Sequence, residues 1–213
     1  MNARLKEIFS NLDRCKTFAD IGCDHGYMAE AMLKSGKCEN AIISDVSAKC
    51  LEKAQELLKD YIESGKVKSA VSDGFDKVGE CDLALIAGMG GEEIVSILKK
   101  ASILPQKLVL QPMKNADKVR VQALNSGYKV IKDYVFYSSK VYYDIIVLEK
   151  GEDNLTAEEI EFGRTNVVER GDAFVSQVKE RIEKYKHYAN GVAVSEEIKK
   201  GMLLEIQKLS KYV

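Results

Sequence analysis

Short apolar runs alternate with longer amphipathic stretches along the first 125 residues. Five runs predict buried strands, because each is short and bounded by polar or glycine-containing turns: TFADIGC, AIISDV, VKSAVSD, DLALIAG and KLVLQP. Helical crossovers are expected over residues 27–35, 47–64, 91–101 and 116–124. Strands that alternate with helices in this way predict a parallel sheet with helices on both faces.

The pattern changes after residue 125. YKVIKDYVFYSS and VYYDIIVLEK follow each other around Ser139 and Lys140 with no helix between them, which predicts an antiparallel hairpin. Five β/α units that end in a hairpin are typical of the class I methyltransferase sheet, whereas dehydrogenase domains usually end on a further parallel strand. We therefore predict an α/β, Rossmann-like sheet of the methyltransferase class.

Both ends of the chain are helical in pattern. Residues 1–12 form one apolar stripe that should pack on the domain, and Thr156 to Glu159 fits a capping box that opens a short helix. Two antiparallel helices should follow, with a turn at Asn190 and Gly191. Their apolar faces are Phe174, Val178, Ile182 and Tyr185, then Ile198, Met202, Ile206 and Leu209. We expect a cofactor-binding domain at 1–154 and a coiled-coil-like helical extension at 155–213.

Composition narrows the function classes. With 32 basic and 33 acidic side chains the net charge is −1, so any nucleic-acid-binding surface must be local. Five scattered cysteines favour reduced thiols in a cytoplasmic protein over a disulfide framework or a metal site. No run approaches the roughly 20 apolar residues of a membrane span. We expect a cytoplasmic monomer with no metal and no membrane partner.

The run ADIGCDHGY, residues 19–27, predicts a turn that holds a nucleotide-like ligand. Gly22 and Gly26 permit close backbone approach, and the following helix start leaves unpaired N–H groups. Asp24, however, stands where the dinucleotide fingerprint needs glycine, and a carboxylate there would repel a pyrophosphate. A cationic ligand suits it better, so S-adenosylmethionine is favoured over a nicotinamide cofactor.

Three further acids end predicted strands. Asp20 ends the first strand, and Asp45 follows 25 residues later, near the spacing at which an acid accepts ribose hydroxyls. Asp45 could instead cap the next helix, although Ser47 is better placed for that role. Asp73 should lie beside the adenine of the cofactor, with a plain turn aspartate as its alternative.

The fourth strand is followed by AGMGG, Ala87 to Gly91. Methyltransferases that act on exocyclic amines usually place an Asn or Asp and two prolines here, to hold the target amine. A glycine loop instead suits a ring nitrogen with a free lone pair, which needs positioning but no deprotonation. The alternative is a tight strand-to-helix turn that does not touch substrate.

DIGCDHGY, SDVSAKCLEKA, SDGF, AGMGG and QPMKNADKVR, in this order and spacing, resemble the TrmK family of bacterial tRNA adenine-N1 methyltransferases that act on adenine 22 of the D-loop. The resemblance runs from Arg4 to about Phe162. It implies a class I fold, S-adenosylmethionine as methyl donor, and a helical extension that helps to bind tRNA. FGRTN follows where the family has Phe-Gly-Pro.

The resemblance also implies site residues. Asp24, His25 and Tyr27 would lie at the mouth of the pocket as candidate catalytic residues, with Asp24 stabilising charge on the methylated adenine and with no dedicated general base. For His25 the alternative is a hydrogen bond to nearby backbone, and for Tyr27 it is core packing. The cofactor-binding set is Asp20, Gly22, Cys23, His25, Gly26, Asp45, Val46, Asp73, Gly74, Ala87, Gly88 and Met89.

The helical extension carries a local basic excess. Residues 173–213 hold eight basic and five acidic side chains, which suits RNA or simply a solvated face. Three alternative functions remain open: an NAD-dependent reductase, a small-molecule methyltransferase, and a noncatalytic module that binds RNA or cofactor. The reductase is disfavoured because Tyr128 and Lys132, its only Tyr-x-x-x-Lys pair, fall on a predicted strand, about 13 Å apart.

Overall fold

A computed structural model describes residues 1–190 and 195–213, so Gly191 of the predicted turn lies outside the described residues. Seven strands form one sheet in the order β3-β2-β1-β4-β5-β7-β6. The five predicted strands pair in parallel, and β7 is antiparallel to both β5 and β6, so the predicted Rossmann-like sheet is confirmed. The bounds are β1 Cys15–Ile21, β2 Cys38–Asp45, β3 Val67–Val71, β4 Leu83–Met89, β5 Lys107–Pro112, β6 Tyr128–Ser138 and β7 Val141–Lys150.

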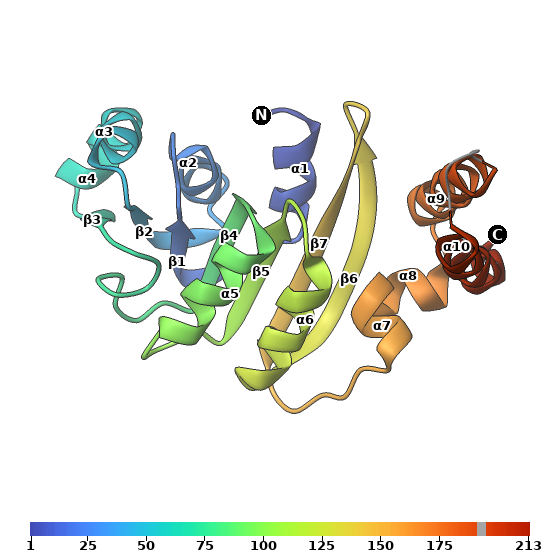
Figure 1. The fold of residues 1–213 in the computed structure, drawn as a ribbon. Helices are drawn as coiled ribbons and strands as arrows, with labels where there is room; N and C mark the ends of the chain where they lie inside the picture. Colours follow the sequence, from blue (N-terminus) through green and yellow to red (C-terminus); the bar gives the residue numbers. More distant parts are fainter. Residues whose placement is uncertain (191–194) are drawn as a thin grey trace.

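Helices cover both faces of the sheet (Figure 1). On one face Ile8, Met32 and Leu51 belong to a single apolar cluster, and on the other Ile94 and Val119 belong to a second. Burial of these stripes is the main stabilising term for the three layers. The first face carries α1 Ala3–Ser10, α2 Tyr27–Lys34, α3 Ala48–Leu57 and α4 Lys59–Glu63, and the second α5 Gly91–Lys100 and α6 Ala116–Asn125.

The expected alternation of strands and helices fails once. Residues 72–82, between β3 and β4, form turns with no helix. Gly74 and Gly79 have φ values of 60° and 75°, which interrupt a right-handed helix, and the Ser72 hydroxyl accepts a hydrogen bond from the Lys77 N–H. Phe75 is buried in the cluster on the α5 side and anchors the loop.

The predicted hairpin between β6 and β7 is confirmed. Ser139 and Lys140 form a two-residue turn with φ values of 51° and 64°, the left-handed backbone that matches strand twist in such hairpins. Because β7 is antiparallel to β5 and β6, this turn lies at the same edge of the sheet as the carboxyl ends of β1 and β4.

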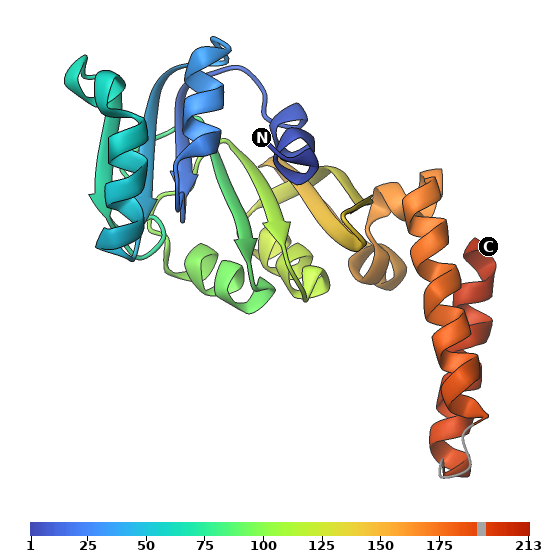
Figure 2. The ribbon, with the colours of Figure 1, turned by 90° about the horizontal axis from the view of Figure 1, so that it is seen from above.

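The C-terminal region begins with α7 Ala157–Phe162, whose capping box between Thr156 and Glu159 is confirmed, and α8 Arg164–Glu169, which was not predicted. The antiparallel pair α9 Asp172–Ala189 and α10 Glu196–Leu209 then projects from the β6 edge, and η1 Ser210–Tyr212 ends the chain (Figure 2). Phe174 and Leu209 are buried as expected. Ile198, near the start of α10, is 55% exposed, so the expected apolar face is not buried there.

A buried ion cluster joins this region to the sheet. The guanidinium of Arg120, on α6, donates to Asp133 on β6 at 2.8 Å, to Asp144 on β7 at 3.1 Å and to the Ile160 carbonyl on α7 at 3.2 Å. The side chains of Arg120 and Asp133 are fully buried. Asp133 also exchanges two hydrogen bonds with Thr165 on α8, so the cluster fixes α7 and α8 against the hairpin.

Arg120→Met should lower the free energy of unfolding by about 3–5 kcal/mol, because it leaves Asp133 buried without its cation. Urea denaturation measures the change. The control is Arg164→Met, since the ion pairs of Arg164 with Asp153 and Glu159 are only partly buried and should be worth about 1 kcal/mol. Equal losses in the two variants would contradict the assigned role of the buried cluster.

Candidate functional site

The carboxyl ends of β1 and β4 open into a cavity of about 410 Å³. This volume lies in the range of small-molecule sites, and the position is where doubly wound sheets bind ligands. Nine of the predicted site residues line it: Asp20, Gly22, Cys23, Asp24, His25, Tyr27, Ala87, Gly88 and Met89.

Asp20 is the most unusual polar group of the cavity. It is 5% exposed, and its Oδ2 is buried without a hydrogen-bond partner among the described residues. Burial raises the pKa of this carboxyl to about 7; a hydrogen bond from the Ala29 N–H opposes the shift, and the charge of Asp45 adds to it. A cationic group donating to Oδ2 would satisfy the oxygen and favour the carboxylate.

The predicted glycines divide into two groups. Gly22 has φ 70°, and a Cβ there would lie 2.0 Å from the Met89 methyl, so glycine lets Met89 cross the floor of the cavity. Gly26 and Gly74 do not line the cavity. A Cβ on Gly26 would lie 3.0 Å from that of Ala54, and one on Gly74 2.7 Å from the Ile97 side chain, so these two glycines serve helix packing.

Asp45 and Val46 lie beyond the lining, at the end of β2. The Asp45 carboxylate accepts the N–H groups of Asp24 and Ser47, at 3.2 and 2.8 Å. Ser47 is the N-cap of α3, so Asp45 does not cap that helix. Val46 is 68% exposed and presents an apolar surface beside the Asp45 carboxylate.

Asp73 also lies outside the lining. Its carboxylate pairs with Lys100 at 2.8 Å, which is a contact to α5 that the sequence did not indicate. The pair is more than half exposed on both sides, so its contribution to stability is small.

Asp24, His25 and Tyr27 form a preorganised group at the cavity mouth. Asp24 has φ 47°, and its Oδ2 lies 2.7 Å from Nδ1 of His25. The His25 and Tyr27 rings are parallel within 3°, with centroids 5.4 Å apart. The partner of His25 is thus a carboxylate rather than backbone, and Tyr27, at 48% exposed, is not a core residue.

Helix α1 supplies site residues that the motifs did not reveal. Asn2, Arg4 and Leu5 line the cavity, and Arg4 Nη1 donates to the Oε1 of buried Gln111 at 2.8 Å. Their only sequence signal was the apolar stripe that docks this helix.

The AGMGG loop turns at the cavity wall. Gly88 has φ 80°, and a Cβ there would lie 3.2 Å from Arg4 Nη1. A Cβ on Gly91 would lie 2.4 Å from the Lys114 carbonyl oxygen, so Gly91 serves the tight start of α5. Gly91 therefore fits a tight strand-to-helix turn, whereas Gly88 lines the cavity.

Cys23 lines the cavity as a neutral thiol. Burial, and then the charge of Asp20, raise its pKa, which disfavours the thiolate. It therefore contributes a small apolar surface and no nucleophile.

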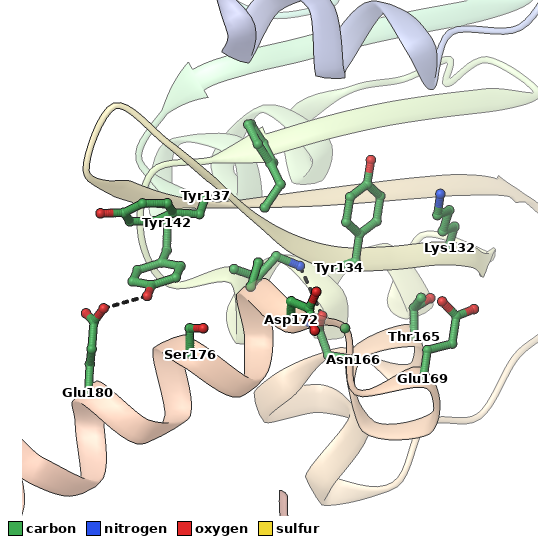
Figure 3. Close-up of a pocket in the computed structure, with 14 residues that line it drawn as sticks. Lys132, Tyr134, Tyr137, Tyr142, Thr165, Asn166, Glu169, Asp172, Ser176 and Glu180 are labelled. Carbon is green, nitrogen blue, oxygen red and sulfur yellow. Dashed lines mark hydrogen bonds between the residues drawn. The ribbon is translucent and has the colours of Figure 1, made fainter. Parts of the chain in front are cut away.

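A second cavity, of about 650 Å³, lies between the β6–β7 hairpin and helices α8 and α9 (Figure 3). Tyr142 crosses it to donate to Glu180 at 2.6 Å. Three acids and a single lysine line it, namely Glu169, Asp172, Glu180 and Lys132, so its charge disfavours a phosphate ligand.

The described part of the chain holds no cluster of three or more histidine, cysteine or acidic side chains arranged to bind a metal. Within the same residues, no helix combines the length and apolar character needed to cross a membrane.

Comparison with known proteins identifies the family. The family model described as a methyltransferase domain matches residues 1–146, more than half of the chain. The chain belongs to this methyltransferase family. The match covers the cavity and every predicted site residue.

Individual relatives of this methyltransferase are more distant. A candidate tRNA methyltransferase of Mycoplasma pneumoniae is 38% identical over 109 residues, 49% of this chain and 50% of that protein. The tRNA (adenine(22)-N(1))-methyltransferase of Bacillus subtilis is 26% identical over 157 residues, 71% of this chain and 66% of that protein. The chain thus spans between half and two thirds of these curated relatives.

A solved structure of M. capricolum TrmK, in complex with S-adenosylhomocysteine, superposes with a TM-score of 0.88 at 22% identity, covering 100% of this chain and 97% of that one. The agreement in fold extends through the C-terminal helices. Together with the Bacillus subtilis relative, it confirms the resemblance to the TrmK family drawn from the motifs.

Asp20→Asn should raise the melting temperature of the ligand-free methyltransferase at pH 8 by several degrees, and by less at pH 5. Asp20 ionises near 3.8 in an unfolded chain and at about 7 in the folded one. Between these values the folded state retains a proton that the unfolded state releases, so the free energy of unfolding falls as pH rises, by at most about 4 kcal/mol.

Thermal melts of both proteins across this pH range measure the effect. The control is Asp60→Asn, a change at an exposed aspartate of α4, whose effect should be small. A pH-independent difference between Asp20→Asn and the parent protein would refute the destabilising role of the buried carboxyl.

Proposed function

We propose that this chain transfers a methyl group from S-adenosylmethionine to N1 of adenine 22 in the D-loop of tRNA. The observation that carries the proposal is the buried, unpartnered carboxylate oxygen of Asp20. Asp20 lines the cavity together with Gly22 and Gly88, at the carboxyl ends of the strands, where doubly wound sheets bind their ligands. The named functions of the relatives and the AGMGG loop support adenine N1 as the acceptor.

The residues fit the cofactor. Asp20 Oδ2 would accept its amino group, and Gly22, Cys23, Ala87, Gly88 and Met89 would lie against its methionine portion. Asp45 would accept the ribose hydroxyls with lone pairs left free by its two backbone bonds. Val46, with Asp73 and Gly74 beyond it, would flank the adenine ring, while Gly26 and His25 would set the start of α2.

The cofactor, when bound, supplies a methyl group on a cationic sulfur. The task of the protein is then to hold adenine N1 in line with that methyl and to exclude water, because a neutral ring nitrogen needs no deprotonation. Asp24, His25 and Tyr27 are placed at the cavity mouth to do this, with the Asp24 carboxylate near the positive charge that appears on adenine.

The C-terminal extension, residues 155–213, is the proposed tRNA-binding part, and residues 1–154 the catalytic part. Of the eight basic side chains at 173–213, four form ion pairs with glutamates, namely Arg181, Lys186, Lys208 and Lys211. Four others form no ion pair among the described residues and are the candidate phosphate contacts: Lys179, Lys184, Lys199 and Lys200. The reduced thiols fit a cytoplasmic setting, and a monomer holds every element of the site.

The test is transfer of labelled methyl from S-adenosylmethionine to unmodified bacterial tRNA, with the modified base mapped by a reverse-transcription stop. A stop at adenine 22 supports the proposal. Binding of cofactor without transfer to tRNA would favour a small-molecule acceptor or a noncatalytic module.

Asp45→Asn should weaken cofactor binding about tenfold, since it removes one charged acceptor at the ribose position. Asp24→Asn should lower kcat with a much smaller change in cofactor affinity, because the proposal assigns the Asp24 carboxylate to the target adenine and not to the cofactor. Calorimetric Kd values and single-turnover rates separate the two effects. Equal losses of both properties in both variants would contradict this division.

Replacing Lys179, Lys184, Lys199 and Lys200 by Gln should weaken tRNA binding about tenfold and lower the slope of log K against log salt concentration by about 2–3. Cofactor affinity should stay unchanged. The control is Lys16→Gln with Lys66→Gln, two exposed lysines outside the extension, one in β1 and the other just before β3. An unaltered slope in the fourfold variant would move the RNA site onto the catalytic part.

A further inference from the structure

The imidazole of His25 is held from two sides. Nδ1 lies 2.7 Å from the Asp24 carboxylate, and the ring stacks in parallel on Tyr27. In the neutral imidazole, the nitrogen that faces a carboxylate carries the proton, which leaves the other nitrogen as an acceptor. Asp24 thus selects the tautomer in which Nε2 has a free lone pair.

This lone pair is available at the cavity mouth. No hydrogen bond to Nε2 is made by the residues that the structure describes, and the side chain is 40% exposed where it lines the cavity. The His25 and Tyr27 rings lie too close for a base to enter between them. An incoming base must therefore approach the exposed part of the His25 ring.

We propose that Nε2 of His25 accepts a hydrogen bond from the exocyclic 6-amino group of the target adenine, and that Asp24 acts as the positioning residue that makes Nε2 an acceptor. The inference rests on the proposed function and adds how the target base is selected. The 6-amino group is adjacent to N1, so this one bond would both identify adenine and place its nucleophile. A 6-oxo purine offers a carbonyl there, and two acceptors repel.

The same bond strengthens as the reaction proceeds. The N1 lone pair forms the new bond to the methyl carbon, the electron pair of the broken S–CH3 bond stays on sulfur, and the positive charge passes to adenine. That charge spreads onto the 6-amino nitrogen, which makes its N–H a better donor. A hydrogen bond that is stronger in the transition state than in the ground state accelerates the chemical step.

The test uses two synthetic tRNAs, one with adenine and one with unsubstituted purine at the target position. Purine keeps the N1 lone pair but lacks the 6-amino group. His25→Phe keeps an aromatic ring over Tyr27 without the acceptor, and should lower the adenine-to-purine ratio of single-turnover rates about tenfold relative to the parent protein. His187→Phe, at the other histidine of the chain, should leave the ratio unchanged.

Asp24→Asn should lower the ratio as well, and combining it with His25→Phe should add little, because both changes remove one bond. Nitrogen-15 NMR of the imidazoles gives a second readout, simplified by the presence of only two histidines. The parent protein should show His25 protonated at Nδ1, and Asp24→Asn should shift it toward the Nε2 protonated form.

The outcomes separate the inference from the proposed function. Absence of transfer to the adenine tRNA by the parent protein would overturn the proposed function. Transfer with an unchanged ratio in His25→Phe, or a parent His25 protonated mainly at Nε2, would overturn the inference alone.

Discussion

The burial of one guanidinium organises the junction between the two parts of this chain. The Arg120 side chain is buried from water, and each of its three guanidinium nitrogens donates a hydrogen bond to a protein acceptor, on β6, β7 or α7. Asp133 in turn binds the backbone and hydroxyl of Thr165. The helical pair therefore starts from a fixed position beside β6, the outermost strand. The β6–β7 turn lies at the carboxyl ends of the parallel strands, where the cavity also lies.

The cavity also contains a buried charged group, but this group lacks a partner for one of its atoms. Each guanidinium nitrogen of Arg120 has an acceptor, whereas Asp20 is buried with one oxygen unpartnered. The folded chain therefore contains an electrostatic cost that a bound cation would relieve. The cavity mouth is organised differently, by the stacked and hydrogen-bonded His25. Asp20 thus selects a ligand by its charge, whereas His25 at the cavity mouth constrains the position of an incoming group.

The sequence pattern predicted those elements whose formation depends on residues close together in the chain. Hydrophobic period and strand length located β1 to β5, and the absence of a helix around Ser139 and Lys140 located the hairpin. Residues 72–82 are the exception to the alternation of strands and helices, and Gly74 and Gly79 adopt positive φ values there. Helix α8 was missed because its hydrogen bonds to β6, through Thr165 and Asn166, are long-range.

The site was predicted with the same limits. Strand-end acids and glycines lie where the motifs place them, because a parallel sheet brings its carboxyl ends to one edge. The sequence pattern does not reveal three contacts: the packing of Gly26 against Ala54, the ion pair of Asp73 with Lys100, and the hydrogen bond from Arg4 to Gln111. Each depends on which helix faces which strand, and that is decided by packing of the whole chain.

Two glutamates of α7, Glu158 and Glu161, make the packing of the C-terminal helices sensitive to ionic strength. Arg181 on α9 and Lys208 on α10 bind Glu161, and Lys211 on η1 binds Glu158, so partly exposed ion pairs hold α9, α10 and η1 against α7. Salt screens such pairs over the same range in which it weakens contacts with phosphates. The position of the helical pair against α7 is thereby coupled to the medium, and its stiffness becomes a property that the surrounding ionic composition can adjust.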